Sequence, residues 1–229
     1  DAIRAFIKDA QKEIEEGNWI FLGGDFNEPS HFDWIETTKD SADHHEVVVP
    51  WPVTTLLHEA GFKDSYREKY PNPVTHPGYT YPSDNLALPP NKITWTPDAD
   101  ERDRIDYIFY YPRKGLHLKE AAILGPKTSI RRSQRVAESG QDVFIEPLGV
   151  WPTDHQSSWR RVVTTRLHEV SLKDFYRENY LKIRTLSSIG LNSLAPGSCK
   201  GAPKGIWAIN SQVSGNCHSL ATASSINGL

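Results

Sequence analysis

The first 25 residues contain two hydrophobic patterns, one helical and one extended. Over residues 2–16, AIRAFIKDAQKEIEE, apolar side chains recur at a spacing of three and four, and Gly17 and Asn18 follow as a stop signal. This pattern predicts an amphipathic helix that buries one face. The apolar run at residues 19–22 predicts a buried strand that ends in two glycines and Asp25. The apolar stripe of the helix consists of Ile3, Phe6, Ile7, Ala10 and Ile14.

Short helical and extended patterns alternate along the rest of the first two thirds of the chain. Residues 54–60 predict a short helix closed by Gly61, and RIDYIFY at 104–110 is the clearest strand pattern. Aromatic and β-branched residues predict further strands at residues 79–81, 94–96, 121–124 and 158–163. Because helices and strands interleave, the predicted fold class is α/β.

The composition is that of a soluble, globular protein. Of the 229 residues, 38% are hydrophobic and 24% are charged, and no apolar run is long enough to cross a bilayer. We therefore expect no transmembrane segment, and a secreted or a cytoplasmic location fits equally well. The net charge of -3 gives no overall attraction to nucleic acid, and we interpret the basic group at residues 131–135 as a solvated loop. Cys199 and Cys217 define neither a disulfide framework nor a zinc site.

An internal repeat divides the chain. The segment VTTLLHEAGFKDSYREKY at 53–70 recurs as VTTRLHEVSLKDFYRENY at 163–180, with 12 of 18 positions identical. Beyond the second copy the chain is rich in Ser, Gly, Asn and Ala and has no sustained periodicity. We therefore expect one domain at 1–163 and an appendage at 164–229. The chain contains no Met and begins inside a helical pattern, so we expect a fragment or a cleaved precursor.

Three short motifs place acids, an amide and a histidine at the edges of predicted strands. They are GDFN at 24–27, RIDYIF at 104–109 and TDH at 153–155. Asp25 and Asn27 lie two residues apart, so in an extended chain both project from one face, where a metal, a water or a phosphate could meet both. The alternative is an ordinary turn, because Asp and Asn are common turn residues and Pro29 follows.

The third motif adds the group that can exchange a proton. The ring of His155 titrates near neutral pH, and Asp106 could hold that ring in one tautomer. Asp154 and His155 would point to opposite faces of a regular strand, so we expect them on a turn after Pro152. A hydrolase of phosphate esters needs a hard cation held by carboxylates, an oriented water and donors for the charge on the transferred phosphorus. The three motifs contain side chains suited to each task.

In this order and at these spacings, the motifs GDFN, RIDYIF and PTDH resemble those of the endonuclease/exonuclease/phosphatase superfamily. That group includes DNase I-like nucleases, sphingomyelinases and inositol-polyphosphate phosphatases. The resemblance covers residues 1–163 and implies a DNase I-like four-layer α/β sandwich with a mixed sheet, of which this chain holds the C-terminal half. Thr153 stands where the family has a Ser before the final Asp-His.

The resemblance also implies roles for individual residues. Asp25 would activate or position the attacking water and contribute to the metal site, while Asn27 would orient the phosphate. Asp154 would help to hold Mg2+, with Mn2+ or Ca2+ as alternatives. His155, paired with Asp106, would contact the phosphoryl oxygens. The implied reaction is hydrolysis of a phosphodiester or phosphomonoester by in-line attack of water, on a small molecule, a lipid headgroup or nucleic acid.

One part of the family pattern has no counterpart. The N-terminal half of the family's fold supplies an Asn, a metal-binding Glu and a further His ahead of GDFN, and this chain has no such positions. We therefore expect the parent protein to be an Mg2+-dependent phosphoesterase and the isolated chain to have little or no activity. The alternative is a noncatalytic remnant of the fold that binds a ligand or a partner.

For other polar and aromatic residues, the sequence evidence for a place in the site is weaker. His31 follows the first motif closely enough to reach the same pocket, or it serves only in the loop. Tyr81 and Trp95 could stack on a substrate, although aromatic residues in strands more often belong to the core. We expect solvated positions for the cluster 44–46, for the charged turn 98–104, and for the ion-pairing residues Glu59, Lys63, Arg67 and Glu68.

Overall fold

The computed structural model describes residues 2–41, 43–146, 148–164, 170–171 and 206–208, and these form an α/β fold. The helices are α1 (Ala2–Glu15), α2 (Pro52–Glu59) and α3 (Ser65–Lys69), with a 3-10 turn η1 (Pro90–Lys92). The strands are β1 (Phe21–Asp25), β2 (Lys63–Asp64), β3 (Asp106–Tyr110), β4 (Leu116–Leu124), β5 (Thr128–Arg131), β6 (Gln134–Ala137), β7 (Phe144–Ile145), β8 (Ser157–Thr164), β9 (Val170–Ser171) and β10 (Ile206–Ala208).

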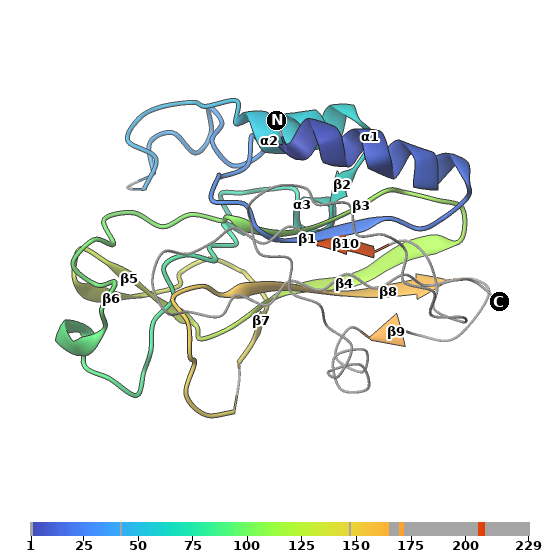
Figure 1. Ribbon diagram of the computed structural model, residues 1–229. Helices are drawn as coiled ribbons and strands as arrows, with labels where there is room; N and C mark the ends of the chain where they lie inside the picture. The colour runs from blue at the N-terminus through green and yellow to red at the C-terminus, as the bar shows by residue number, and fades with distance from the viewer. Residues whose placement is uncertain (1, 42, 147, 165–169, 172–205, 209–229) are drawn as a thin grey trace.

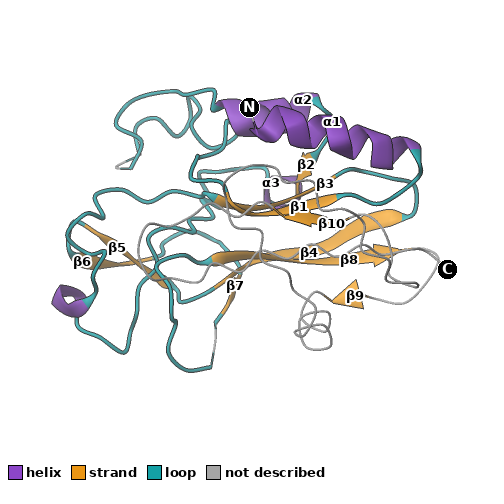
Figure 2. Ribbon diagram, in the orientation of Figure 1, coloured by secondary structure: helices purple, strands orange, loops and turns teal. Residues whose placement is uncertain are grey.

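The strands build two four-stranded sheets and one hairpin. The first sheet has the order β10-β1-β3-β2 and the second the order β7-β4-β8-β9, while β5 pairs with β6. Both larger sheets are mixed, because β10 joins β1 and β7 joins β4 in parallel while the other neighbours are antiparallel. Figure 1 shows α1 and α2 over one face of the first sheet, with the second sheet beneath it. The described chain is therefore layered helix, sheet, sheet, as the colours of Figure 2 make plain.

Helix α1 packs its apolar stripe on the first sheet, as the sequence predicts. Ile3, Phe6 and Ala10 are buried, and the ring of Phe6 lies 5.7 Å from the ring of Phe62. Removing such apolar surface from water contributes about 25 cal/mol per Å2. The same core contains Ile20, Leu22, Leu57, Tyr107 and Phe109. Because β1 and β3 run through this core, it sets where the ends of both strands lie.

Two of the predicted strands are wrong. Over residues 79–81 the chain makes only an isolated bridge between Tyr81 and Asp103, and residues 94–96 lie in turns. Their aromatic and β-branched composition reflects burial instead, since Trp95 packs on a small buried cluster beside the hairpin. Strand propensity measures how well a side chain fits a half-buried surface, and a packed loop offers the same environment.

The hairpin β5–β6 has no counterpart among the predicted elements. Its turn is made by Arg132 and Ser133, whose φ angles are 49° and 60°. Tight hairpin turns with positive φ are usually signalled by Asn-Gly or Asp-Gly, and Arg-Ser carries no such signal. Residues 132–135 are exposed, as expected of a solvated loop, whereas Arg131 is partly buried. Arg131 Nη1 lies 3.1 Å from the buried carboxylate of Asp43.

Several residues that we expect in solvent are buried. His44 is buried and stacks on the ring of Trp34, with ring centroids 4.6 Å apart. Residues 102–104 of the charged turn and the side chain of Arg67 are buried as well. Each of these charged residues meets an oppositely charged or hydrogen-bonding partner inside the fold. Charged side chains are rarely buried unless they are paired, and the pairing here joins segments far apart in the sequence.

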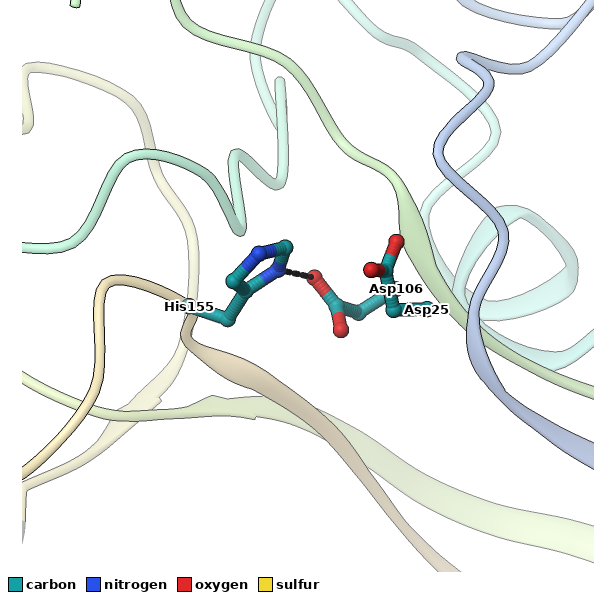
Figure 3. A group of neighbouring side chains, drawn as sticks. All are labelled: Asp25, Asp106 and His155. Atoms are coloured by element: carbon teal, nitrogen blue, oxygen red, sulfur yellow. Dashed lines mark hydrogen bonds and ion pairs between the residues drawn. The ribbon is translucent and has the colours of Figure 1, made fainter. Parts of the chain in front are cut away.

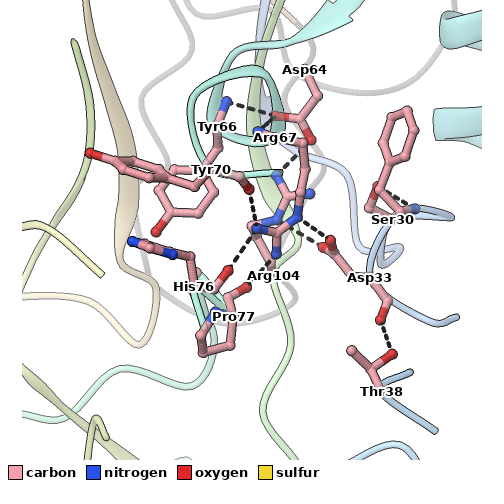
Figure 4. Close-up of polar contacts among 12 residues, drawn as sticks. Ser30, Asp33, Thr38, Asp64, Tyr66, Arg67, Tyr70, His76, Pro77 and Arg104 are labelled. Atoms are coloured by element: carbon pink, nitrogen blue, oxygen red, sulfur yellow. Dashed lines mark hydrogen bonds and ion pairs between the residues drawn. The ribbon is translucent and has the colours of Figure 1, made fainter. Parts of the chain in front are cut away.

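A buried charge cluster of Asp33, Asp64, Arg67 and Arg104 joins the loop after β1 to α3 and to the start of β3 (Figure 4). Asp33 accepts hydrogen bonds from Arg67 Nε at 2.5 Å and from Arg104 Nε at 2.8 Å. The Asp64 carboxylate caps the N-terminus of α3 and also lies 2.7 Å from Arg104 Nη1. Burial raises the pKa of Asp33, but the two guanidinium groups outweigh it and hold that pKa below its ordinary value.

The expected appendage contributes short strands. β9 pairs with β8 in the second sheet, and β10 lies beside β1, with Ile206 opposite Phe21. Most of the second repeat copy, at 163–180, lies outside the described residues. Within the described part of the chain, no helix has the length and apolar character needed to span a membrane.

Candidate functional site

The three sequence motifs meet where β1, β3 and β8 come together. Asp25 is the last residue of β1 and Asp106 the first of β3, and the two are opposite each other in the antiparallel pairing. His155 lies just before β8. One carboxylate oxygen of each aspartate and one ring nitrogen of His155 all lie within 4.8 Å of one another. Figure 3 shows the imidazole pointing at Asp106, with Asp25 beside it. We call these three residues the triad.

The GDFN motif is both a turn and a source of polar side chains. Asn27 has a φ of 48°, a conformation that Asn tolerates better than most residues. Its backbone N–H donates to Asp25 Oδ1 at 2.7 Å, and its Nδ2 donates to Asp25 Oδ2 at 3.1 Å. Phe26 packs its ring 5.2 Å from that of Tyr107 in the core. The turn therefore holds the Asp25 carboxylate in one orientation at the end of a well-packed strand.

Asp106 and His155 form a hydrogen-bonded pair. His155 Nδ1 lies 3.1 Å from Asp106 Oδ2, and the two side chains are 16% and 13% exposed. Burial lowers the pKa of His155, but the hydrogen bond and charge of Asp106, with the charges of Asp25 and Asp154, outweigh it and raise the pKa to about 9. The imidazole is therefore a cation at neutral pH. Since Nδ1 is used on Asp106, Nε2 is the nitrogen that can donate to a ligand.

The segment that carries His155 is held by its own neighbours. Trp151 Nε1 donates to the carbonyl of His155 at 2.7 Å, and the backbone N–H of His155 donates to Thr153 Oγ1 at 3.2 Å. Residues 153 and 154 form a bend rather than a strand, which confirms the predicted irregular segment after Pro152. The Thr153 hydroxyl thus serves as an acceptor that orders the histidine segment.

Asp154 and Tyr81 lie next to the triad. The carbonyl of Asp154 accepts from the backbone N–H of Ser83 at 2.5 Å, and the charge of its side chain contributes to the raised pKa of His155. The ring of Tyr81 lies 4.9 Å from the ring of His155. Burial, followed by the charge of Asp154, raises the pKa of Tyr81, so its phenol is neutral. Two predicted site residues are therefore brought to the triad from different loops.

His31 and Trp95 make their contacts elsewhere. His31 Nδ1 lies 2.8 Å from the Thr54 hydroxyl on α2, and its ring lies 5.4 Å from the ring of His58. Trp95 Nε1 donates to the Ser83 carbonyl at 2.9 Å, and its ring packs on the cluster under the hairpin. None of these contacts involves the triad.

Two further residues support the triad without any sequence motif of their own. The Thr80 hydroxyl accepts from the backbone N–H of Asp106 at 3.1 Å, and the Ser158 hydroxyl donates to the Asp106 carbonyl at 2.7 Å. Thr80 is 26 residues away from Asp106 along the chain, so no local pattern connects the two. Ser158 follows the TDH motif within a few residues, and this nearness in sequence was a signal that could have placed it at the site.

The donor set of the site fits a hard cation held by carboxylates. Mg2+ is commonly bound through one or two carboxylates together with waters and substrate phosphates. Asp25 and Asp106 supply two carboxylates within 4.8 Å of each other, and the charge of Asp154, outside that group, acts on the same His155. Only a deprotonated ring nitrogen has a lone pair for a metal, so a cation bound by His155 would have to displace a ring proton.

Comparison with known proteins does not establish a family. No protein-family model matches the chain, and no solved structure matches it. The chain is 46% identical over 91 residues to an uncharacterized protein of Caenorhabditis elegans. That match covers 40% of this chain and 27% of the relative, so the chain spans much less than the length of the protein it resembles.

Proposed function

We propose that this chain carries part of the active site of a metal-dependent phosphate ester hydrolase. The observation that supports this proposal is the charged His155, held by Asp106 and placed within 4.8 Å of Asp25. A partly buried cation beside a carboxylate can bind an anionic ester and orient water against it. Strongly perturbed titratable groups that gather in this way are typical of functional sites.

Each residue has a distinct task in this proposal. His155 donates from Nε2 to a phosphoryl oxygen, and its charge offsets the negative charge that grows there in the transition state. Asp106 accepts from Nδ1 and keeps the ring in the orientation that presents Nε2. Asp25 orients the attacking water and accepts its proton. Asn27 orients Asp25 and, through its amide, the phosphate.

The cation of this proposal is Mg2+, with Mn2+ or Ca2+ as alternatives, and Asp25 and Asp154 are the residues that would hold it. A bound divalent cation neutralises phosphate charge and lowers the pKa of a water molecule. Binding and orientation of the ester are assigned to His155 and Asn27.

We further propose that the fold is the C-terminal half of a DNase I-like four-layer sandwich, as in the endonuclease/exonuclease/phosphatase superfamily. The support is the helix, sheet, sheet layering with mixed sheets and with the three motifs at strand ends. Small phosphoesters, lipid headgroups and nucleic acids all present the phosphoryl group that this site would bind, so the assay separates diesters from monoesters first.

The test is hydrolysis of bis(p-nitrophenyl) phosphate and p-nitrophenyl phosphate by this protein with Mg2+. Replacing His155 with Ala should reduce the rate by about 10²- to 10⁴-fold, because a charged donor to the reacting phosphate is lost. His45→Ala is the matched control: His45 also pairs with a carboxylate, at 2.6 Å from Glu101, but its side chain is 52% exposed and distant in sequence from the motifs. Equal rates for the two variants would overturn the proposal.

A second experiment distinguishes ester hydrolysis from binding of a phosphate anion without hydrolysis. Phosphorus NMR of inorganic phosphate, with and without Mg2+, measures whether the site takes the anion at all. Binding that His155→Ala abolishes and His45→Ala retains, in a protein that hydrolyses neither ester, would indicate the noncatalytic ligand-binding module instead. Binding that neither substitution changes would remove the triad from both functions.

A further inference from the structure

Thr80 occupies a fully buried position between the segments that carry Asp106 and His155. Its backbone N–H donates to the Asp103 carbonyl at 2.9 Å, and its own carbonyl accepts from the backbone N–H of Gln156 at 2.6 Å. Asp103 precedes β3 and Gln156 precedes β8. One residue therefore joins the chain just before Asp106 to the chain just after His155.

The hydroxyl of Thr80 accepts hydrogen bonds from two backbone N–H groups of the same region. Thr80 Oγ1 accepts from the backbone N–H of Ile105 at 3.0 Å and from that of Asp106 at 3.1 Å. A hydroxyl has two acceptor lone pairs and one proton, so these two bonds leave the proton to be donated. Burial raises the pKa of Asp106, and the hydrogen bond and charge of His155 act against that rise, with a smaller contribution from the Thr80 side chain.

Neighbouring contacts limit the movement of the pair on its other sides. Ser158 Oγ donates to the Asp106 carbonyl at 2.7 Å, and the ring of Tyr81, the residue after Thr80, lies 4.9 Å from that of His155. The backbone of Asp106 is thus held by two hydroxyls. Its carboxylate meets His155 Nδ1 at 3.1 Å.

We propose that Thr80 is a positioning residue, whose hydroxyl fixes the backbone at Asp106 so that the Asp106 carboxylate meets His155 Nδ1 and holds the histidine ring in place. This structural claim stands on the hydrogen bonds alone. Its consequence for turnover rests on the proposed phosphoesterase function. Supporting partners of catalytic groups typically change activity by about 10- to 100-fold when they are removed.

The variants are Thr80→Val, which keeps the shape and removes the hydroxyl, and Thr80→Ser, which keeps the hydroxyl. Thr54→Val is the matched control, because Thr54 is equally buried and its hydroxyl also accepts from a backbone N–H, that of His31 at 3.0 Å. The readout is the imidazole N–H proton that His155 donates to Asp106, seen by proton NMR and assigned by its absence in His155→Gln. We expect Thr80→Val to shift or lose this signal, and Thr80→Ser and Thr54→Val to retain it.

In a form of the protein that hydrolyses a model ester, Thr80→Val should lower kcat by about 10- to 100-fold with little change in KM, and Thr80→Ser should restore it. An unchanged N–H signal in folded Thr80→Val would overturn the proposal. Loss of the signal in a protein without any hydrolytic activity would instead support Thr80 and count against the phosphoesterase.

A measurement on the unsubstituted chain covers the case in which Thr80→Val does not fold. Amide protons donated to a fully buried hydroxyl exchange slowly with water. We expect slowly exchanging amide protons at Ile105 and Asp106, each with a nuclear Overhauser effect to the Thr80 side chain. Amide protons at both positions that exchange rapidly, or that show no such effect, would overturn the proposal.

Discussion

At the scale of single residues, His155 combines an ordinary side chain with an unusual charge state. Its ring is mostly buried, which by itself would favour the neutral form. Asp106 at 3.1 Å, with Asp25 and Asp154 nearby, reverses that preference. The sequence motifs suggest the partnership of His155 and Asp106, but the charge of the ring follows only from how close the fold brings these carboxylates to it.

Replacing His155 with Gln should lower stability most in mildly acidic solution and least in alkaline solution. The folded pKa of about 9 lies above the ordinary value of 6.5. A base with a raised folded pKa contributes stability that is fully present below the unfolded pKa and is lost as the pH rises through the folded one. This shift corresponds to roughly 3 kcal/mol at most.

Urea unfolding of both forms at about pH 6, 8 and 10 measures this difference, since the effects of the other titrating groups largely cancel between them. The exposed His45→Gln serves as control and should show a much smaller dependence. A stability difference for His155→Gln that grows from pH 6 to pH 10 would contradict the charged histidine.

At the scale of elements, the long loop after β1 depends on charge rather than on apolar packing alone. Asp33 brings the loop to α3 and β3 through Arg67 and Arg104, and the three side chains are 8%, 4% and 1% exposed. From sequence, Arg67 belongs to a solvent-facing series with Lys63 and Glu68. The structure turns Arg67 inward, because Asp33 and the carbonyls of the loop at residues 70–77 converge on its guanidinium.

Removing Asp33 should destabilise the fold strongly. Asp33→Ala leaves two buried guanidinium groups without their shared carboxylate, which typically costs about 3–5 kcal/mol. Lys63→Ala is the matched control, because the Lys63–Glu68 pair at 3.3 Å has side chains 48% and 33% exposed, and such pairs contribute about 0–1 kcal/mol. Urea unfolding midpoints of the two variants give the comparison. Similar midpoints would mean that the cluster contributes no more than a surface pair.

The elements also show where sequence patterns succeed and fail. The helix at α1 and the strands β1 and β3 follow a clear periodicity or a strong apolar run, and the structure confirms them. The hairpin β5–β6 escapes prediction because its turn uses Arg132 and Ser133 in left-handed conformations, which the sequence does not signal. Residues 94–96 mislead because Trp95 packs against a buried cluster from a turn rather than from a sheet.

At the scale of the whole molecule, the first sheet is completed by a strand that is far away in the sequence. β10 pairs with β1 in parallel, so the edge of β1 opposite β3 is covered by residues 206–208. Covering an exposed edge protects a sheet from pairing with other chains. Because β1 ends at Asp25, the pairing of β10 with β1 also helps to hold this residue of the triad in place.

Replacing Trp207 with Pro should open this edge, because Pro fixes φ near roughly −65°, far from the roughly −120° of a parallel strand. The amides of β1 that point toward β10 should then exchange with deuterium faster, while those bonded to β3 stay protected. Hydrogen exchange followed by NMR measures each amide separately, and Trp207→Val controls for loss of the indole. Unchanged exchange throughout β1 in Trp207→Pro would show that the pairing with β10 adds no protection.

The amino-acid sequence by itself determined the α/β class, the amphipathic helix α1, the strands that carry Asp25 and Asp106, and the grouping of GDFN, RIDYIF and TDH as candidate chemistry. These features are local, because periodicity and turn preference act over a few residues. Only the tertiary structure decided that Thr80 and Tyr81 reach the triad, that His31 and Trp95 contact other parts of the fold, and that the Asp33 cluster is buried. Those outcomes depend on contacts between distant segments and on the exclusion of water, which no short stretch of sequence encodes.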